Sequence, residues 1–314
     1  MNPLLDRIER ELGLPGLVDR LSQDLTPTDL QSLLLETYRR RASRRRPAEV
    51  LADYEANRFV RPAAVSARLL LAWEQLAFAH LPPEFEPVVL APVCPLGASS
   101  AVAGVDQNWA VATARNTEVV SDSTNVLALE CALRRRALLR TQPKSAEAVH
   151  LAAHHRLLRA QHYSDPGALP HFSALALCSA GRDSGGLRFE LDALARQIRF
   201  YLQALAAFLG PGVPLHVTLT DLAAAPRGPL LQEQLLRPMQ AQFPAASFAF
   251  DPDRAGGRGY YRDLCFHIEA THPSAGRLQL VDGGSVDWTQ KLLGSAKERL
   301  VISGLGSDRL CTMF

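Results

Sequence analysis

DGGSVDWTQKLLGSAKERLVISGLGSDRL, residues 282–310, is the stretch that decides the fold. It contains a glycine pair, a short helical run, an apolar strand over 300–302 and the ending Gly304-Leu305-Gly306-Ser307-Asp308-Arg309-Leu310. Glycines let a bulky ligand lie directly on the backbone, and an arginine offers a permanent forked cation to a phosphate or carboxylate. The order of these pieces therefore predicts a glycine floor beside an anion-binding arginine.

The composition is that of an ordinary globular protein, with 47% hydrophobic and 21% charged residues among 314 and a net charge of +2. This charge predicts no strong general attraction to nucleic acid or membrane. The start of the chain lacks the apolar core of a signal peptide, and no uncharged apolar run approaches the ~20 residues that span a bilayer. Five scattered cysteines and the adjacent His154 and His155 indicate neither a disulfide framework nor a metal site. We expect a cytoplasmic protein without membrane contact.

Arginines gather in two short stretches of the sequence. The first contains Arg39, Arg40, Arg41, Arg44, Arg45 and Arg46, and the second contains Arg134, Arg135 and Arg136. The first group suits a solvated helix end, where cations complement the helix dipole. The alternative is a contact with RNA or an acidic partner, and no interleaved aromatic or glycine pattern supports it. We favour the solvated helix end.

Helical signals dominate the first part of the chain. Thr26, Pro27 and Asp29 supply a cap, a first-turn proline and a first-turn acid, and leucines recur after them at helical spacing. A second apolar stripe follows Pro62 and ends near the Pro82-Pro83 pair. The sequence therefore predicts a helical N-terminal extension over 1–60, followed by a core domain over 61–314.

The rest of the chain mixes strands with irregularly placed helices. We expect strands at 85–95, 109–114, 172–178, 215–220, 247–250, 264–269 and 277–281, and helices at 126–139, 145–165, 187–208 and 229–243. The strands at 264–269 and 277–281 are typical of a hairpin. Because regular alternation of strand and helix is missing, the pattern predicts an α+β fold with a mainly antiparallel sheet flanked by helices.

The order of these pieces resembles the catalytic core of class II aminoacyl-tRNA synthetases. More narrowly, it is similar to the histidyl-tRNA synthetase branch and its non-aminoacylating relatives, such as the regulatory subunit of ATP phosphoribosyltransferase. Pro92 stands where motif 1 of the family ends its dimer-interface strand, and the 304–310 ending resembles motif 3, whose arginine binds the γ-phosphate of ATP. The resemblance implies a homodimer and binding of ATP with Mg²⁺.

Three further segments carry the resemblance to the amino-acid pocket of the family. Residues 115–118 and 122–124 are similar to the Leu-Arg-Pro-Glu-Gly-Thr segment that contacts the ligand's amino group. Gly259-Tyr260-Tyr261 resembles part of the histidine pocket, and Gly283-Gly284 with Asp287 stands where the family has Gly-Gly-Arg-Tyr-Asp. The residues predicted to contact a ligand are Arg115, Glu118, Thr124, Arg182, Arg258, Tyr260, Tyr261, Gly283, Gly284, Gly304, Gly306 and Arg309.

Two departures from the family pattern decide what the resemblance implies. Motif 2 carries Phe-Arg-x-Glu, whose arginine grips the α-phosphate and whose glutamate reads adenine, whereas the strand over 174–179 reads ALALCS. Arg182 or Arg188 is the candidate substitute. The arginine expected four residues before the tyrosine pair is replaced by Gly256, with Arg254 and Arg258 beside it. The sequence also ends soon after Leu310, so we expect neither an anticodon-binding domain nor a tRNA-charging activity.

Three functional hypotheses remain open at this point. The first is a regulatory subunit that binds an amino acid or nucleotide in a former synthetase pocket and works with a catalytic partner protein. The second is an ATP-dependent enzyme that activates an amino acid, and the third is a module that contacts RNA, tRNA included. Some of these residues also have a structural interpretation. Arg309 could form an ion pair, Glu118 could be a surface acid, and the tyrosines could lie at the edge of the core.

Overall fold

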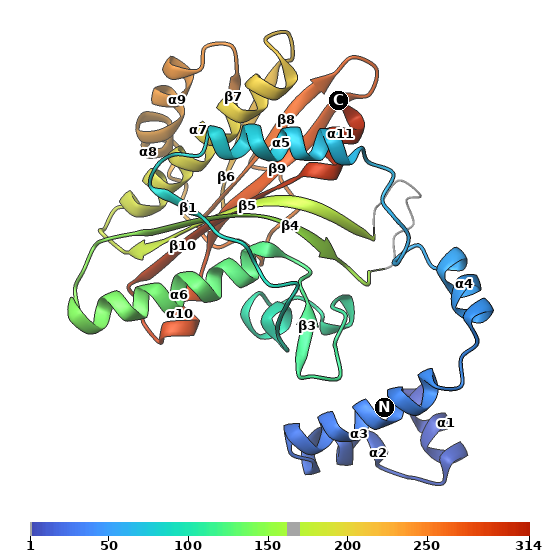
Figure 1. Cartoon of the computed structure of the whole chain (residues 1–314). Helices are drawn as coiled ribbons and strands as arrows, with labels where there is room; N and C mark the ends of the chain where they lie inside the picture. The colour runs from blue at the N-terminus through green and yellow to red at the C-terminus, as the bar shows by residue number, and fades with distance from the viewer. Residues whose placement is uncertain (1, 162–169) are drawn as a thin grey trace.

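An eight-stranded sheet forms the centre of the computed structural model, which describes residues 2–161 and 170–314 (Figure 1). The strand order is β1-β4-β5-β10-β9-β8-β6-β7, and all neighbours are antiparallel except the β1–β4 and β6–β7 pairs. The strands are β1 (Phe85–Pro87), β4 (Val149–Leu158), β5 (His171–Arg182), β6 (Leu215–Asp221), β7 (Ser247–Phe250), β8 (Leu264–His272), β9 (Gly276–Val286) and β10 (Glu298–Gly306). The predicted α+β class with a mainly antiparallel sheet is confirmed.

Helices cover both faces of this sheet, as the alternation of side chains along its strands requires. Leu175 and Leu177 of β5 face α7 (Arg188–Leu209), which packs on this face with α5 (Ala67–Ala79), α8 (Gly228–Leu231) and α9 (Arg237–Gln242). Ala176 and Cys178 face α6 (Ser123–Thr141) and α10 (Trp288–Leu293) on the other side. A small second sheet pairs β2 (Val93–Pro95) with β3 (Thr117–Val119). The eight-stranded sheet is therefore the middle of three layers.

The C-terminal helix α11 (Ser307–Met313) is anchored to the core by polar contacts at its first turn. The Trp73 indole N–H of α5 donates to Ser307 Oγ at 3.0 Å, and His154 Nε2 lies 3.1 Å from the same oxygen. Asp308 is fully buried and accepts hydrogen bonds from Ser173 N at 2.9 Å and Arg156 Nη2 at 3.1 Å. These contacts fix the position of the next residue, Arg309.

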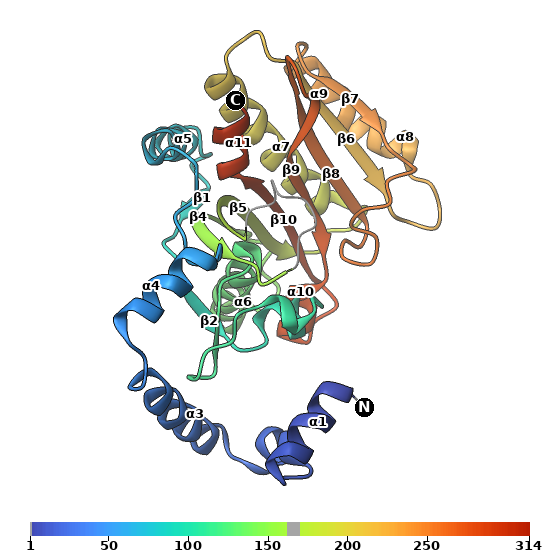
Figure 2. The ribbon, with the colours of Figure 1, turned by 90° about the vertical axis from the view of Figure 1, so that its right-hand side faces the viewer.

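The first sixty residues form a helical arm that lies apart from the core (Figures 1 and 2). The arm contains α1 (Pro3–Leu12), α2 (Leu17–Asp19), the π-helical turn η1 (Arg20–Asp24), α3 (Pro27–Ala42) and α4 (Pro47–Ala56), and none of its described residues is buried. Thr26 caps α3, as the sequence predicts. Asn116 Nδ2 donates to Pro27 O at 3.2 Å, which ties α3 to the loop before β3.

Some predicted elements differ from the structure. The helix expected at 145–165 is wrong, because Val149–Leu158 is strand β4 between β1 and β5; residues 162–165 of that prediction lie outside the described residues. The strand expected at 109–114 is absent from the described chain, where η3 (Gln107–Trp109) and a single bridge at Ala112 stand instead. The stretch 85–95 forms two short strands. Within residues 2–161 and 170–314, no helix has the length and apolar character to cross a membrane.

Strand β4 makes the stability of the fold depend on pH. Burial lowers the pKa of His150, His154 and His155 below the ordinary value of 6.5. Because the unfolded chain binds these protons first, the stabilisation is complete above pH 6.5 and is lost as pH falls toward the folded pKa values, by about 1.4 kcal/mol per pH unit for each proton. Urea unfolding at several pH values should show this loss, and the His154→Gln variant should reduce it. A control variant, His80→Gln at an exposed helix end, should keep the wild-type slope; a flat profile in the wild type would contradict the prediction.

Candidate functional site

A cavity of about 990 Å³ lies on the sheet face that α6 and α10 leave uncovered. Alternate residues of two neighbouring strands form its base, Ala174 and Ala176 from β5 and Ile302 and Gly304 from β10. The polar and aromatic side chains of its wall are Trp109, Ser121, Asp122, Ser123, Thr124, Asn125, Arg159, Gln161, Phe172, Tyr260, Tyr261, Gln279, Asp282, Ser303, Arg309 and Thr312. Two cations, two acids and several hydroxyl and amide groups therefore surround a largely apolar floor.

Gly304 and Gly306 line this cavity, and among residues 2–161 and 170–314 no side chain fills the space above them. A Cβ placed on Gly304 would meet only Leu175 O, at 3.8 Å, and one on Gly306 would meet only Arg309 Cβ, at the same distance. The packing of the protein therefore does not require glycine at either position. Missing side chains there enlarge the cavity, as expected for a floor on which a ligand lies.

The glycine pair of β9 has a different role. Gly283 and Gly284 do not line the cavity, and both lie within the strand rather than at a turn. A Cβ on Gly283 would come within 2.6 Å of Phe266 and Ser303, and one on Gly284 within 2.7 Å of the Tyr261 ring and 2.5 Å of Leu264 O. The pair serves close packing, and at Gly284 it makes room for the Tyr261 ring.

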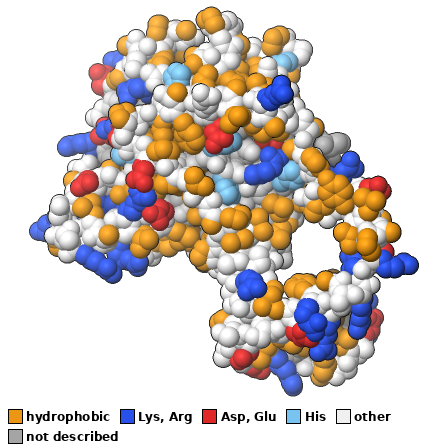
Figure 3. Space-filling model, in the orientation of Figure 1, with side chains coloured by type: hydrophobic (Ala, Val, Ile, Leu, Met, Phe, Trp, Pro, Cys, Tyr) orange, Lys and Arg blue, Asp and Glu red, His pale blue; other side chains and the backbone are white. Residues whose placement is uncertain are grey.

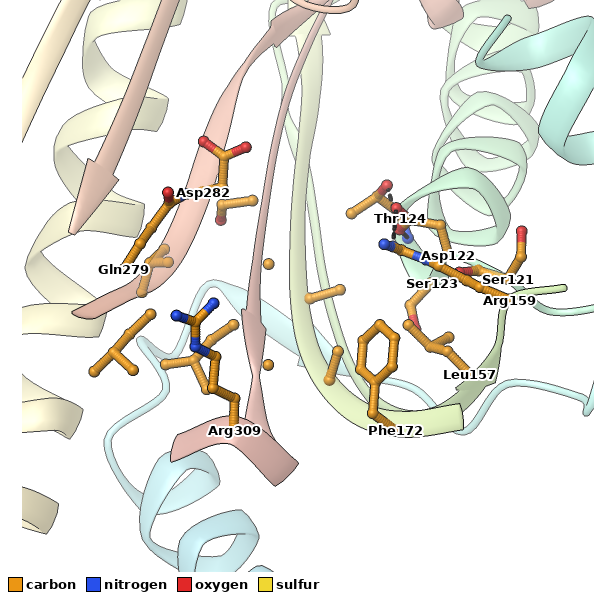
Figure 4. A pocket seen from close by; sticks show the side chains of 18 of the residues that line it. Ser121, Asp122, Ser123, Thr124, Leu157, Arg159, Phe172, Gln279, Asp282 and Arg309 are labelled. Atoms are coloured by element: carbon orange, nitrogen blue, oxygen red, sulfur yellow. Dashed lines mark hydrogen bonds and ion pairs between the residues drawn. The ribbon is translucent and has the colours of Figure 1, made fainter. Parts of the chain in front are cut away.

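Arg309 extends into the cavity from the first turn of α11 toward Gln279 (Figure 4). Within residues 2–161 and 170–314, its guanidinium makes no hydrogen bond and no ion pair. The neighbouring Asp308 is bound to Arg156 and to β5. A positioned and unpaired guanidinium above an open glycine floor is suited to bind a carboxylate or a phosphate.

A second arginine, Arg159, lies across the cavity beside Asp122 and Thr124 (Figure 4). Its Nε donates to Ser121 O at 3.0 Å, its Nη2 lies 3.3 Å from Asp122 Oδ2, and its guanidinium stands 5.2 Å from the centre of the Phe172 ring. Asp122 Oδ1 in turn accepts from the backbone N–H and the hydroxyl of Thr124 at the start of α6. These contacts hold Arg159 rigidly at the cavity wall.

Arg159 and Gln161 are not among the residues predicted from the sequence to contact a ligand. They follow β4 in the order Leu158-Arg159-Ala160-Gln161, which has the spacing of Phe-Arg-x-Glu with leucine and glutamine at its two ends. The structure thus places Arg159 and Gln161 at the cavity wall after the end of β4, whereas the strand over 174–179 contributes only Ala174 and Ala176 to the cavity. The spacing was readable in the sequence, but the helix expected over 145–165 obscured it.

The tyrosine pair and Asp282 close another side of the cavity. Tyr261 Oη donates to Asp282 Oδ2 at 3.1 Å, and Arg254 Nη2 donates to Asp282 Oδ1 at 2.5 Å. Burial raises the pKa of both Tyr260 and Tyr261 well above 10.0, so both remain protonated at neutral pH. Arg254, six residues before Tyr260, therefore reaches the cavity wall although Gly256 occupies the expected arginine position.

Besides Gly283 and Gly284, four more of the predicted residues do not lie at this cavity in the structure. Arg115 is exposed in a turn, Arg182 ends β5, and the Arg258 side chain donates to the carbonyls of Arg254 and Pro252. Glu118 is fully buried and accepts from Ser99 N at 2.8 Å, Gly97 N at 3.0 Å and Gln107 Nε2 at 2.7 Å.

The surroundings of Glu118 suit a structural role. Burial raises the pKa of the carboxyl, but the hydrogen bonds from Gln107, Ser99 and Gly97 outweigh burial and leave the pKa below its ordinary value. The charged carboxylate thus holds the loop over 97–107 in place, where the sequence allowed only a ligand contact or a surface acid.

No protein-family model and no curated protein matches this sequence. Solved structures do resemble it. An ATP phosphoribosyltransferase regulatory subunit/histidyl-tRNA synthetase from Bacillus halodurans aligns with a TM-score of 0.61 and 11% identity, over 82% of each chain. Apo histidyl-tRNA synthetase from S. aureus aligns with a TM-score of 0.55 and 12% identity, over 78% of this chain and 64% of that enzyme.

A histidine–tRNA ligase subunit from Alicyclobacillus acidocaldarius has a similar likeness, with a TM-score of 0.56 and 12% identity over 81% of this chain and 96% of its own. At such identities the likeness establishes the fold. This chain therefore has the fold of the class II aminoacyl-tRNA synthetase core, in the form found in histidyl-tRNA synthetases and in the regulatory subunit related to them.

Proposed function

We propose that this protein binds an amino acid or a nucleotide in the cavity and acts as the regulatory subunit of a catalytic partner. The single observation that supports binding is the Arg309 guanidinium, which has no partner among the described residues and lies in the same cavity as the open floor at Gly304. The regulatory role draws support from the likeness to a protein described as a regulatory subunit.

The wall of the cavity indicates the chemistry of the ligand. Arg309 is free to bind the carboxylate of an amino acid or a phosphate group of ATP, and Phe172 offers an aromatic surface to a planar base. Among the described residues, no group of three or more His, Cys, Asp or Glu side chains could hold a metal ion. A ligand with a carboxylate or a phosphate group suits this wall.

The Arg309→Ala variant should bind the ligand about 10- to 100-fold more weakly, because a charged hydrogen bond is worth about 1.5–3 kcal/mol. Isothermal titration of the wild type with each amino acid, ATP and AMP identifies the ligand and measures this loss. The Arg309→Lys variant keeps the charge but loses the fork and should fall between the two. Arg258→Ala, on an exposed loop outside the cavity, serves as the control and should bind like the wild type. Absence of binding by any of these ligands would refute the proposal.

A second function, activation of an amino acid by ATP, is favoured by one observation. Arg159 and Gln161 have the Arg-x-Glu spacing of motif 2 at the cavity wall, although glutamine replaces the acid and Arg159 is bound to Asp122. A positioned cation at the α-phosphate is typically worth about 10²–10³ in rate. Pyrophosphate exchange with each of the twenty amino acids distinguishes the two functions. Exchange that is lost in Arg159→Ala would establish activation, and silence would leave the regulatory role.

The homodimer implied by the resemblance would use the stretch near Pro92. Val89 is fully exposed between β1 and β2, at the edge of the large sheet, and Val93 is also exposed. An unpaired apolar edge is a template for pairing with another chain. This surface supports the proposed homodimer of the core.

A further inference from the structure

The helical arm, residues 2–60, exposes far more apolar surface than the core. Eleven of the eighteen large hydrophobic side chains that are exposed among the described residues belong to it: Leu4, Leu5, Leu12, Leu14, Val18, Leu33, Tyr38, Val50, Leu51, Tyr54 and Val60. No described residue of the arm is buried. Short helices gain most of their stability from packing an apolar face, so the arm needs a surface to cover it.

The core of the same chain does not supply that surface. The arm touches it through the Asn116–Pro27 hydrogen bond at one end and joins it through residues 57–66 at the other. Figure 3 shows an opening between the arm and the core, with hydrophobic side chains at its border. Leu4, Leu5 and Leu12 of α1 and Leu33 of α3 thus remain exposed within the monomer.

The arm begins with an acidic segment and continues with a basic one, so the charges of one copy complement those of another. Residues 2–29 carry six acids and three arginines, a net charge of −3, whereas residues 30–46 carry six arginines and one glutamate, a net charge of +5. Part of this positive charge is neutralised by ion pairs with Glu36, Glu49 and Asp53. Within the described chain, the guanidinium groups of Arg41 and Arg44 have no such partner.

These features distinguish a protein partner from nucleic acid. Residues 2–60 contain ten arginines and ten acids, so the arm as a whole has no net positive charge to attract phosphates. A phosphate backbone also leaves leucine and valine side chains uncovered. In a two-fold symmetric dimer every contact occurs twice. The acidic segment of each copy can therefore face the basic segment of the other.

We propose that the arm is a dimerisation element that pairs with the arm of a second copy of this chain. The exposed leucines and valines form the contact, and the acidic residues 2–29 of each copy face the arginines over 39–46 of the other. Pairing of the arms would also affect the ligand cavity, because the connecting residues 57–66 include Ala64 and Val65 of its wall. His171 Nε2 donates to Arg61 O at 2.7 Å and holds this connection against β5.

A charge-exchange experiment tests this pairing in the full-length chain. One variant, Arg41→Glu with Arg44→Glu, makes the arm acidic, and a second, Asp6→Arg with Asp24→Arg, makes it basic; all four positions are exposed. Each variant alone should dimerise at least about tenfold more weakly than the wild type, because like charges meet across the interface. An equimolar mixture of the two should restore dimerisation. Sedimentation velocity measures association, and circular dichroism checks that the helices remain formed.

Two further variants separate the arm from other contacts. Leu33→Asp should weaken dimerisation without being rescued by either charge variant, whereas Val89→Asp tests the sheet edge of the core. Association of both charge variants at the wild-type strength, a mixture that fails to recover, or a monomeric wild type at high micromolar concentration would overturn the proposal. A salt-dependent gel shift with tRNA that is lost in Arg41→Glu with Arg44→Glu would assign the surface to RNA instead. Ligand titration of the charge variants tests the cavity separately.

Discussion

Replacing Glu298 by alanine should lower the free energy of unfolding by about 3–5 kcal/mol, because it leaves a buried cation without its partner. Glu298 and Arg135 are both fully buried and form a bidentate ion pair, with Nε–Oε2 at 2.9 Å and Nη2–Oε1 at 3.0 Å. Arg135 also donates to the carbonyls of Glu147 and Ser145. The pair joins α6 to the first residue of β10, the strand that carries the glycine floor.

Urea unfolding measures this loss. The control is Glu233→Ala, because Glu233 forms a mostly exposed pair with Arg237 and its removal should cost less than about 1 kcal/mol. The double variant Arg135→Met with Glu298→Leu removes both charges and should recover much of the stability. Equal effects of Glu298→Ala and Glu233→Ala would contradict the importance of the buried pair.

Replacing Trp73 by alanine should cost about 3–5 kcal/mol and also weaken ligand binding. Trp73 is fully buried, and its ring centre lies 5.2 Å from that of Phe208. Its indole N–H donates to Ser307 Oγ, two residues before Arg309. The variant therefore leaves a large void and releases the turn that positions the free arginine.

Leu71→Ala on the same helix is the matched control, because Leu71 is 65% exposed and its loss should leave stability nearly unchanged. Thermal unfolding and isothermal titration should both separate the two variants. If Trp73→Ala binds ligand as strongly as the wild type, the contact with Ser307 does not position Arg309.

The sequence predicts the fold through elements whose local signals agree with their tertiary surroundings. The capped helix that begins after Thr26, the helix that begins after Asp122 and the β8–β9 hairpin carry such signals, and all three are present. Strand β4 does not, because its alanines, leucines and arginine favour a helix by propensity. Its pairing with β1 and β5 overrides that preference. This pairing depends on residues that are distant in the sequence.

The candidate site was predictable in the same partial way. Gly304, Gly306, Arg309, Thr124 and the tyrosine pair lie around one cavity, to which three separate segments of the chain contribute. Glu118 binds a loop more than ten residues away along the chain, which spacing alone does not reveal. Arg159 was missed because its role depends on β4 being a strand that ends at the cavity.

Arg135 illustrates the limit of reading charge from composition. It belongs to a run of three arginines, of which Arg134 reaches Glu86 and Glu130 near the surface while Arg135 points into the core. Neighbouring residues of a helix point in different directions, so Arg134 and Arg135 face different surroundings. Burial of Arg135 becomes favourable through its ion pair with Glu298, far along the chain.

A crystal structure of the protein soaked with ATP and the amino acid selected by titration tests the central claim most directly. The account predicts a ligand lying on Gly304 with a carboxylate or phosphate oxygen within hydrogen-bond distance of the Arg309 guanidinium. A ligand bound elsewhere, or one in this cavity that Arg309 does not contact, would contradict it.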